Sequence, residues 1–211
     1  MLISRIELDL NKYNTRRAIS VPQVLHAAVE GCFPDKTDKE RKLWRLDRLY
    51  GSLYLLLLSR EKPIFEEFAR QFCYEDVAGE TKDYTILLST IRSGAKYRFR
   101  LRANPTHSVP LEMGVRGKIY PHITIEQKRN WLLKKTQNCG FKLNELCFDV
   151  VETDYLRFWR KGTARPVELS IAVYEGELEV SDRELFVKSL IYGIGRAKAY
   201  GCGMLTVEGI R

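Results

Sequence analysis

The chain has 211 residues, of which 45% are hydrophobic and 29% are charged, and 35 Lys and Arg residues against 27 Asp and Glu residues give a net charge of +8. This composition is typical of a folded globular protein and excludes a disordered chain. The longest apolar run, Leu53–Leu58, is too short to cross a bilayer, and the N-terminal residues lack a basic segment followed by an apolar one. We therefore expect neither export nor membrane insertion, and a cytoplasmic location.

Strand and helix patterns alternate along the first half of the chain. We expect strands at residues 5–10, 53–59 and 84–90, and helices at residues 21–32 and 63–73. Ser20 and Gln23 have the S-x-x-Q spacing of a capping box, which predicts the start of the first of these helices.

The second half repeats the same order of elements. We expect strands at residues 96–103, 141–151, 167–174 and 204–208, with a basic turn at 157–162 between the middle two. Thr124 and Gln127 predict a second capping box for a helix that ends near Gly140, and Ser181 is expected to cap a helix that reaches residue 192.

Two successive β-α-β…α-β units of about 100 residues are typical of an α+β protein. We predict two tandem ferredoxin-like (βαββαβ, RRM-like) domains, one spanning residues 1–91 and the other residues 92–211. Ser93-Gly94 is the expected break between them.

The positive charge is confined to the second half. Residues 1–91 contain 14 basic and 14 acidic side chains, whereas residues 92–211 contain 21 and 13, and residues 92–165 alone contain 16 and 6. Such a segment attracts polyanions, of which nucleic acid is the commonest. A solvated surface with a chance excess of cations is the alternative.

Three basic segments are candidate nucleic-acid contacts. In the strand 96–103, Lys96, Arg98, Arg100 and Arg102 share one face, which favours a bound phosphate backbone or, equally, acidic neighbours across the sheet. The turn 157–162 carries Arg157, Arg160 and Lys161 beside Phe158 and Trp159, either of which could stack on a base or anchor the core. The glycine-rich stretch 193–203 carries Arg196 and Lys198, and it matches no Walker or dinucleotide fingerprint, so phosphate binding and a tight connector both remain open.

Residues that could carry catalysis are few. The five cysteines form no C-x-x-C pair and the three histidines are far apart, so we expect reduced thiols, no metal site and no cofactor. His26 projects from the apolar face of its helix, beside Gln23 and Glu30, where an imidazole can meet a ligand and titrate near neutrality.

These motifs together resemble the CRISPR repeat-processing endoribonucleases of type I-E systems, the CasE family. The resemblance covers nearly the whole chain and rests on the order and spacing of five features. They are the strand 3–9, Leu25-His26 followed by Phe33-Pro34, the phrase 97–105 (YRFRLRANP), Trp131-Leu132, and the glycine-rich stretch 193–205.

The resemblance implies a metal-independent endoribonuclease that binds the hairpin of a CRISPR repeat transcript. Such an enzyme cuts once at the 3′ base of the stem and stays bound to its product as a subunit of the Cascade complex, with no direct contact to DNA and none to membranes. It implies that His26 is catalytic, that a hairpin matching Arg157–Lys161 enters the RNA groove, and that the loop of Arg116, Gly117 and Lys118 lies near the cleavage region.

One position departs from the family pattern. Members often have Tyr three residues before the histidine, where this chain has Gln23, and Gln cannot transfer a proton at neutral pH. We keep Gln23 as a supporting or capping residue, and we expect Arg16, Arg17 or Lys118 to stabilise negative charge in the transition state. A non-catalytic RNA-hairpin-binding subunit of the same fold is the alternative function.

Overall fold

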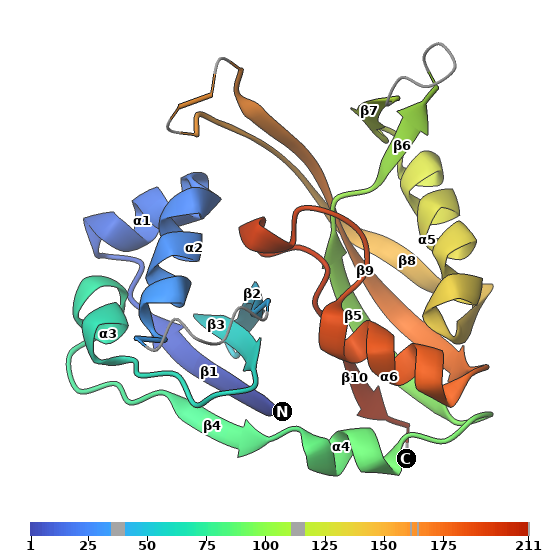
Figure 1. Cartoon of the computed structure of the whole chain (residues 1–211), viewed down its shortest axis with the longest axis horizontal. Coiled ribbons are helices and arrows are strands. Elements are labelled where there is room, and N and C mark those ends of the chain that lie inside the picture. The colour runs from blue at the N-terminus through green and yellow to red at the C-terminus, as the bar shows by residue number, and fades with distance from the viewer. Residues whose placement is uncertain (35–40, 111–116, 161, 164, 211) are drawn as a thin grey trace. The chain divides into compact units, whose positions relative to one another are not determined.

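The computed structural model describes residues 1–34, 41–110, 117–160, 162–163 and 165–210 (Figure 1). The chain divides into two compact units. The first comprises Met1–Ile91 and Lys198–Gly201, and the second comprises Arg92–Ala197 and Cys202–Arg211. The predicted second domain therefore contains a four-residue segment that packs with the first unit.

The first unit is a four-stranded antiparallel sheet with helices inserted between its strands. The sheet order is β2-β3-β1-β4. Its elements are β1 (Leu2–Leu8), α1 (Tyr13–Ser20), α2 (Pro22–Gly31), β2 (Leu43–Leu49), β3 (Ser52–Ser59), α3 (Glu66–Phe72), β4 (Glu80–Asp83), α4 (Thr85–Thr90) and the short 3₁₀ helix η1 (Lys198–Tyr200).

Alternating apolar side chains build the core of this unit. Ile6 and Leu8 of β1 face the same way as Leu55 and Leu57 of β3, and all four are buried in one cluster. The helices cover that cluster with side chains at helical spacing, among them Leu25 and Val29 of α2 and Phe68 and Phe72 of α3. This packing orients α2 and so determines which of its residues face outward.

The second unit repeats the arrangement and adds a small two-stranded sheet. The main sheet is antiparallel with the order β10-β5-β9-β8, and β6 pairs only with β7. Its elements are β5 (Lys96–Ala103), β6 (Thr106–Val109), β7 (Lys118–Pro121), α5 (Ile125–Cys139), β8 (Phe141–Phe158), β9 (Val167–Val180), α6 (Arg183–Tyr192) and β10 (Leu205–Gly209).

In both units the four main strands have the spatial order fourth, first, third, second, with a helical crossover after the first and the third. This is the ferredoxin-like βαββαβ arrangement, so the predicted fold class is confirmed. In the second unit, Tyr97 and Phe99 of β5 are buried beneath the helices, and the Tyr97 ring lies 6.4 Å from that of Phe186 on α6.

The helix boundaries confirm one predicted capping box and overturn two predicted caps. Thr124 and Gln127 form the expected reciprocal hydrogen bonds at the start of α5, and Gly140 ends that helix in the left-handed conformation. Helix α6 is capped by Asp182, whose carboxylate accepts from the backbone N–H of Leu185, and Ser181 lies one residue outside the helix.

The capping box predicted at Ser20 and Gln23 is wrong. Ser20 is the last residue of α1, and its hydroxyl donates to the carbonyl of Arg16. Helix α2 begins at Pro22 with Val21 as its N-cap and has no side-chain cap. Pro22 is favoured at the first helical position because it has no N–H to satisfy, and its helix start leaves Ser20 out of register for capping.

Residues 85–90 form the helix α4, contrary to the strand predicted at 84–90. The carboxylate of Asp83 accepts hydrogen bonds from the N–H and hydroxyl of Thr85 at 2.8 and 2.6 Å, which starts α4 directly after the short strand β4. The sequence patterns also missed α1, β2 and the β6–β7 pair.

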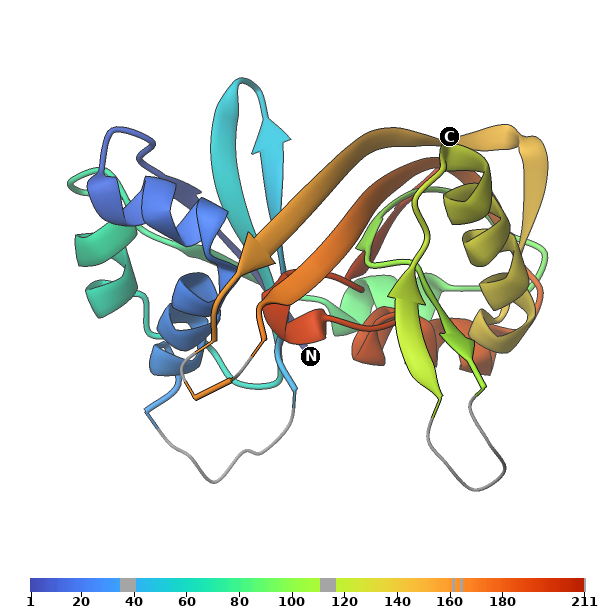
Figure 2. The ribbon, with the colours of Figure 1, turned by 90° about the horizontal axis from the view of Figure 1, so that it is seen from above.

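The strands β8 and β9 are much longer than predicted. Figures 1 and 2 show them continuing as a two-stranded ribbon beyond the other strands of their sheet. Their pairing extends without further shifts from Glu152 and Val173 to Phe158 and Val167. The ribbon therefore carries the basic turn away from the core of the second unit.

All five cysteines are free thiols, and four of them are buried, while Cys147 is exposed. Burial raises the pKa of the Cys32 and Cys73 thiols to about 12, so both remain protonated at neutral pH. Among the described residues, no helix combines the length and the apolar character that crossing a bilayer requires.

Candidate functional site

His26 lies on the partly exposed side of α2. Its neighbours Leu25 and Val29 are buried in the core, whereas the His26 side chain retains 30% of its accessible surface. One turn further along, the Glu30 carboxylate lies with Oε1 3.9 Å from His26 Nδ1. That separation is too long for a hydrogen bond, but it allows the carboxylate to stabilise a protonated imidazole.

Gln23 lies one turn before His26 on the same helix and is half-buried. It does not take part in a cap, so nothing in the helix start requires a glutamine there. Its amide can donate and accept hydrogen bonds but cannot exchange a proton with a substrate. His26, unlike Gln23, carries a side chain that can transfer a proton.

Arg16 and Arg17 lie side by side on α1 and differ in their contacts. Arg16 Nη1 donates to the carbonyls of Leu10 and Asn11 at 2.9 and 2.7 Å, so this guanidinium holds the loop before its own helix. Arg17 is exposed, and its side chain makes no ion pair or hydrogen bond with the described residues. Arg17 is therefore the better placed of the two to receive an anion.

Helix α1 is held in place from the core side. The hydroxyl of buried Thr15 donates to the carbonyl of Phe72 at 2.9 Å, and Ala18 is buried one turn later. Arg17 consequently faces away from the core of the first unit. Lys118, the remaining predicted charge-stabilising residue, is an exposed residue of β7 in the second unit.

The basic face of β5 has acidic neighbours directly across the sheet. Lys96, Arg98 and Arg100 are paired in register with Glu179, Glu177 and Glu175 of β9. Arg100 forms an ion pair with Glu175. Arg102 is opposite Val173, and its guanidinium contacts the sulfur of Cys202 at 4.0 Å. Of the two alternatives left open by the sequence, the structure favours local charge balance for this face.

A hollow of the second unit beside this face shows the same balance. It has a volume of about 970 Å³ and is lined by both cations and carboxylates, including Arg98, Arg100, Glu175 and Glu177. Opposite charges directly across a strand pair stabilise each other, which leaves little net charge to attract a polyanion.

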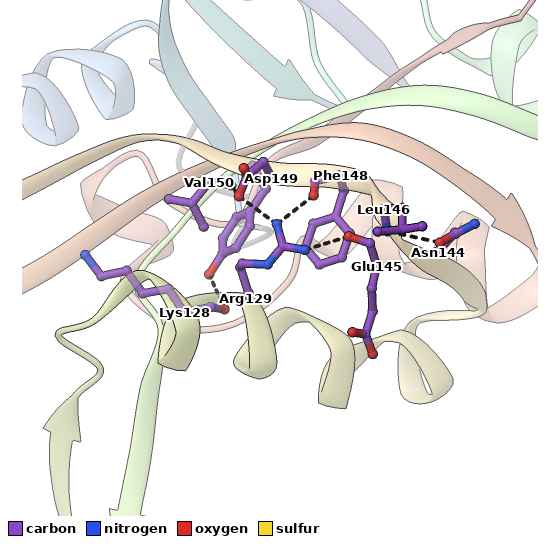
Figure 3. A network of polar contacts seen from close by, with 9 residues as sticks. Lys128, Arg129, Asn144, Glu145, Leu146, Phe148, Asp149 and Val150 are labelled. Atoms are coloured by element: carbon purple, nitrogen blue, oxygen red, sulfur yellow. Dashed lines mark hydrogen bonds and ion pairs between the residues drawn. The ribbon is translucent and has the colours of Figure 1, made fainter.

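A third cation of this hollow, Arg129 of α5, clamps an irregular part of β8 (Figure 3). Its guanidinium donates to the carbonyls of Phe148 and Glu145 at 2.8 and 2.6 Å and to the Asp149 carboxylate at 2.6 Å. It also lies 4.6 Å from the centre of the Phe148 ring. The pairing of β8 with β9 shifts register between Leu143 and Phe148, and Arg129 binds the backbone carbonyl of Glu145 within this segment and that of Phe148 at its end.

Replacing Arg129 with alanine is expected to lower the free energy of unfolding by about 2 kcal/mol, because its charge-assisted hydrogen bonds to two backbone carbonyls and a carboxylate are lost. Asn130→Ala, on the exposed side of the same helix, is the matched control and should change stability by less than about 0.5 kcal/mol. Urea unfolding followed by circular dichroism measures both. Equal stabilities of the two variants would contradict a clamping role.

The tip of the β8–β9 ribbon presents cations and aromatic rings to solvent. Trp159 and Tyr155 are 64% and 54% exposed, whereas Phe158 is buried at 4%. Of the two aromatic residues considered for base stacking, Phe158 is thus covered and Trp159 is available. Arg160 is exposed, and its carbonyl accepts two hydrogen bonds from Thr163 that shape the turn.

Arg157 is 63% exposed and forms an ion pair with Glu168 of the facing strand, with 3.4 Å between Nε and Oε1. Such a pair in solvent is weak, so a phosphate can replace the carboxylate as the partner of this arginine. Lys161 and Arg116, which were predicted to contact RNA, lie outside the described residues.

The glycine-rich stretch is divided between the two units. Arg196 is exposed in the second unit, and Lys198 begins η1 in the first. Gly201 has a φ of +73°, and a Cβ there would lie 2.5 Å from the Trp44 ring of the same unit. At Gly201 the glycine is therefore required by backbone conformation and packing, as the connector alternative predicted.

The chain thus has two ferredoxin-like units. Residues 1–91 carry no net charge and hold a partly exposed histidine, and the second unit is basic and carries a cationic, aromatic ribbon. Such an arrangement is compatible with RNA binding and with acid–base chemistry. The sequence model of the family described as CRISPR associated protein matches residues 1–208, and the chain belongs to that family.

Individual relatives extend this likeness over the whole chain. The chain is 26% identical to the CRISPR-associated endoribonuclease Cse3 of Thermus thermophilus, over 98% of this chain and 99% of the relative. It is 24% identical to the CRISPR system Cascade subunit CasE of Escherichia coli, over 87% and 89%. A solved structure of the endoribonuclease Cse3 bound to a 19-nucleotide RNA is 25% identical, covers 98% of each chain and has a TM-score of 0.79.

Proposed function

We propose that this chain is a metal-independent endoribonuclease that binds the hairpin of CRISPR repeat RNA, cuts it at the 3′ base of the stem and remains bound as a Cascade subunit. The observation that carries the proposal is the placement of His26, a proton-transfer group on a rigid helix, in a chain that matches a CRISPR-associated endoribonuclease from end to end. The five free thiols support action in the cytoplasm.

The groups on α1 and α2 suit attack by the 2′-hydroxyl of the RNA on its own phosphodiester. The 2′-oxygen bonds to phosphorus while the bond from phosphorus to the next 5′-oxygen breaks, which gives a 2′,3′-cyclic phosphate and a 5′-hydroxyl. The reaction requires a base for the 2′-OH proton, an acid for the leaving oxygen and a cation for the phosphorane charge.

In this assignment His26 performs one of the two proton transfers. Glu30 stabilises the imidazolium that forms when His26 accepts a proton, because its carboxylate lies 3.9 Å from Nδ1. Arg17 stabilises the negative charge of the phosphorane, and Arg16 holds the loop before α1. Lys118 of the second unit is a further candidate for charge stabilisation. Gln23 can hydrogen-bond the RNA without exchanging a proton.

The β8–β9 ribbon is the principal element for gripping RNA in the proposal. Its width suits a nucleic-acid groove, its arginines can contact phosphates or guanine edges, and exposed Trp159 can stack on an unpaired base. Lys161 at the same tip, Arg196 and Lys198 remain proposed contacts. Lys96, Arg98, Arg100 and Arg102 contribute less in this assignment, because three of them face glutamates.

Arg157→Ala and Arg160→Ala are each expected to weaken hairpin binding and to reduce the slope of log Kd against log salt by about 1, since each arginine that contacts a phosphate releases a counterion. Arg70 is an exposed arginine of the first unit, so Arg70→Ala is the control and should leave the slope unchanged. Fluorescence anisotropy over a salt series measures the slopes. An unaltered slope in both ribbon variants would contradict phosphate contact.

A non-catalytic RNA-hairpin-binding subunit is the second candidate, and the observation in its favour is Gln23, which provides no second proton-transfer group. Incubation of the protein with an end-labelled repeat hairpin separates the two functions. A single cut at the 3′ base of the stem supports the endoribonuclease, whereas tight binding without any cut supports the subunit that only binds.

A further inference from the structure

A second hollow of the second unit lies between the β6–β7 hairpin, α5 and the glycine-rich stretch. It has a volume of about 410 Å³, within the range of ligand pockets. The side chains that matter for its chemistry are His107, Ile119, Trp131, Lys135 and Arg196, and the backbone of Gly195 completes the wall.

The charge of this hollow is not balanced. Lys135 and Arg196 line it, and no Asp or Glu is among its described lining residues. The other two hollows described in this unit each contain Glu177 and at least one further glutamate beside their cations. Neither Lys135 nor Arg196 forms an ion pair with a described residue. An anion is the ligand that such a site attracts.

A histidine pair lies at the edge of this hollow. The rings of His107 and His122 lie 4.8 Å apart, and Nδ1 of His122 is buried without a hydrogen-bond partner. Burial lowers the pKa of His122, and the nearby His107 and Lys134 lower it further. His122 consequently stays neutral at neutral pH.

Apolar side chains lie beside these cations. The Lys135 ammonium lies 5.9 Å from the centre of the Trp131 ring. Gly195 has a φ of +81°, and a Cβ there would lie 3.0 Å from that ring. Ile119 is 41% exposed on the hairpin side. Cations beside apolar surface match a nucleotide, which combines a phosphate with a flat base and a sugar.

We propose that this pocket, formed by β6, β7, α5 and the glycine-rich stretch, binds one unpaired nucleotide of the RNA that flanks the hairpin. Its phosphate is neutralised by Lys135 and Arg196, and its base or ribose contacts Ile119. A nucleotide within the stem does not enter, because its base is stacked and paired, whereas an unpaired one can turn into a concave site. This inference rests on the proposed hairpin-binding function.

The test compares three RNAs: the bare stem-loop, the stem-loop with a 5′ flank, and the stem-loop with a 3′ flank whose cleavage is blocked by a 2′-deoxy sugar at the cut. Lys135→Gln is expected to weaken binding of at least one flanked RNA about tenfold and to leave the bare stem-loop unaffected. Arg196→Gln changes a residue that is also a proposed hairpin contact, so it is expected to weaken binding of that flanked RNA more than binding of the bare stem-loop. Lys188→Gln, an exposed lysine of α6, removes the same charge elsewhere in the unit and is the control.

Equal affinities of both pocket variants and the control for all three RNAs would overturn the pocket, as would an equal loss on the bare stem-loop and the flanked RNAs. Melting temperatures equal to that of the wild type exclude misfolding as the cause of a loss. If the wild-type protein fails to bind the bare stem-loop at all, the hairpin-binding function itself fails, which distinguishes that outcome from failure of the pocket alone.

Discussion

Replacing His26 with alanine is expected to slow hairpin cleavage by about 10²- to 10⁴-fold, the usual contribution of a positioned acid–base group. The affinity for the hairpin should change little, because His26 lies in the unit without net charge, whereas the basic ribbon of the second unit makes the proposed phosphate contacts. The side chain is 30% exposed and packs on the outer side of α2, so the fold should tolerate its removal. Single-turnover cleavage of a labelled hairpin and anisotropy binding measure the two quantities.

Gln23→Ala is the matched control one turn away on the same helix. It removes no proton-transfer group and no helix cap, so it should cost far less activity than His26→Ala. A His26→Ala protein that cleaves as fast as the wild type would refute the catalytic assignment. A folded Gln23→Ala protein as inactive as the His26 variant would instead give the glutamine a direct role in orienting the RNA.

The fold class could be predicted because each unit repeats one order of strand and helix patterns, and strands such as β5 alternate strictly between apolar and charged residues. A short motif alone was not enough to predict where a helix begins. The spacing S-x-x-Q occurs at Ser20 and T-x-x-Q at Thr124, yet only Thr124 caps a helix. Pro22 decides the difference, because it starts α2 and leaves Ser20 to end the preceding helix.

The sequence predicted only those features of the candidate site that depend on a single helix or strand. The position of His26 relative to the core follows from helical periodicity within α2. The neutralisation of the β5 cations does not follow, because it depends on the register between Arg98 and Glu177, residues almost eighty positions apart. The sequence gives the net charge of the second half, but it does not show which cations lie opposite carboxylates in the sheet.

The nucleotide pocket was beyond the reach of sequence patterns for the same reason. Lys135 and Arg196 come from a helix and a loop, and His107 comes from a hairpin that no pattern predicted. Each is unremarkable alone, since isolated cations and histidines are common on protein surfaces. Only the tertiary arrangement shows that these cations share one hollow without a carboxylate among its described lining residues.

Substituting a 2′-deoxy sugar for the nucleotide 5′ of the cut is expected to abolish cleavage while leaving hairpin binding intact. The proposed reaction uses the 2′-oxygen as its nucleophile, so removing that one atom removes the bond-forming step without changing the stem or its phosphates. The groups on α1 and α2 supply proton transfer and positive charge, which this internal attack requires. Gel analysis of a labelled hairpin with the single substitution, beside the all-ribose hairpin, measures the effect.

The product ends and a chelator test the same mechanism independently. Internal attack leaves a 5′-hydroxyl on the released fragment and a 2′,3′-cyclic phosphate on the retained one. It continues in excess EDTA because the 2′-hydroxyl, in place of a metal-bound water, is the nucleophile. Hydrolysis by such a water would usually leave a 5′-phosphate, cut the deoxy substrate, and stop with EDTA until Mg²⁺ is restored. Observation of that second pattern would overturn both the internal nucleophile and the acid–base role of His26, since a metal-activated water needs neither. Because the deoxy substitution changes only the RNA and the chelator changes only the solution, agreement between them would assign the nucleophile without mutating the protein.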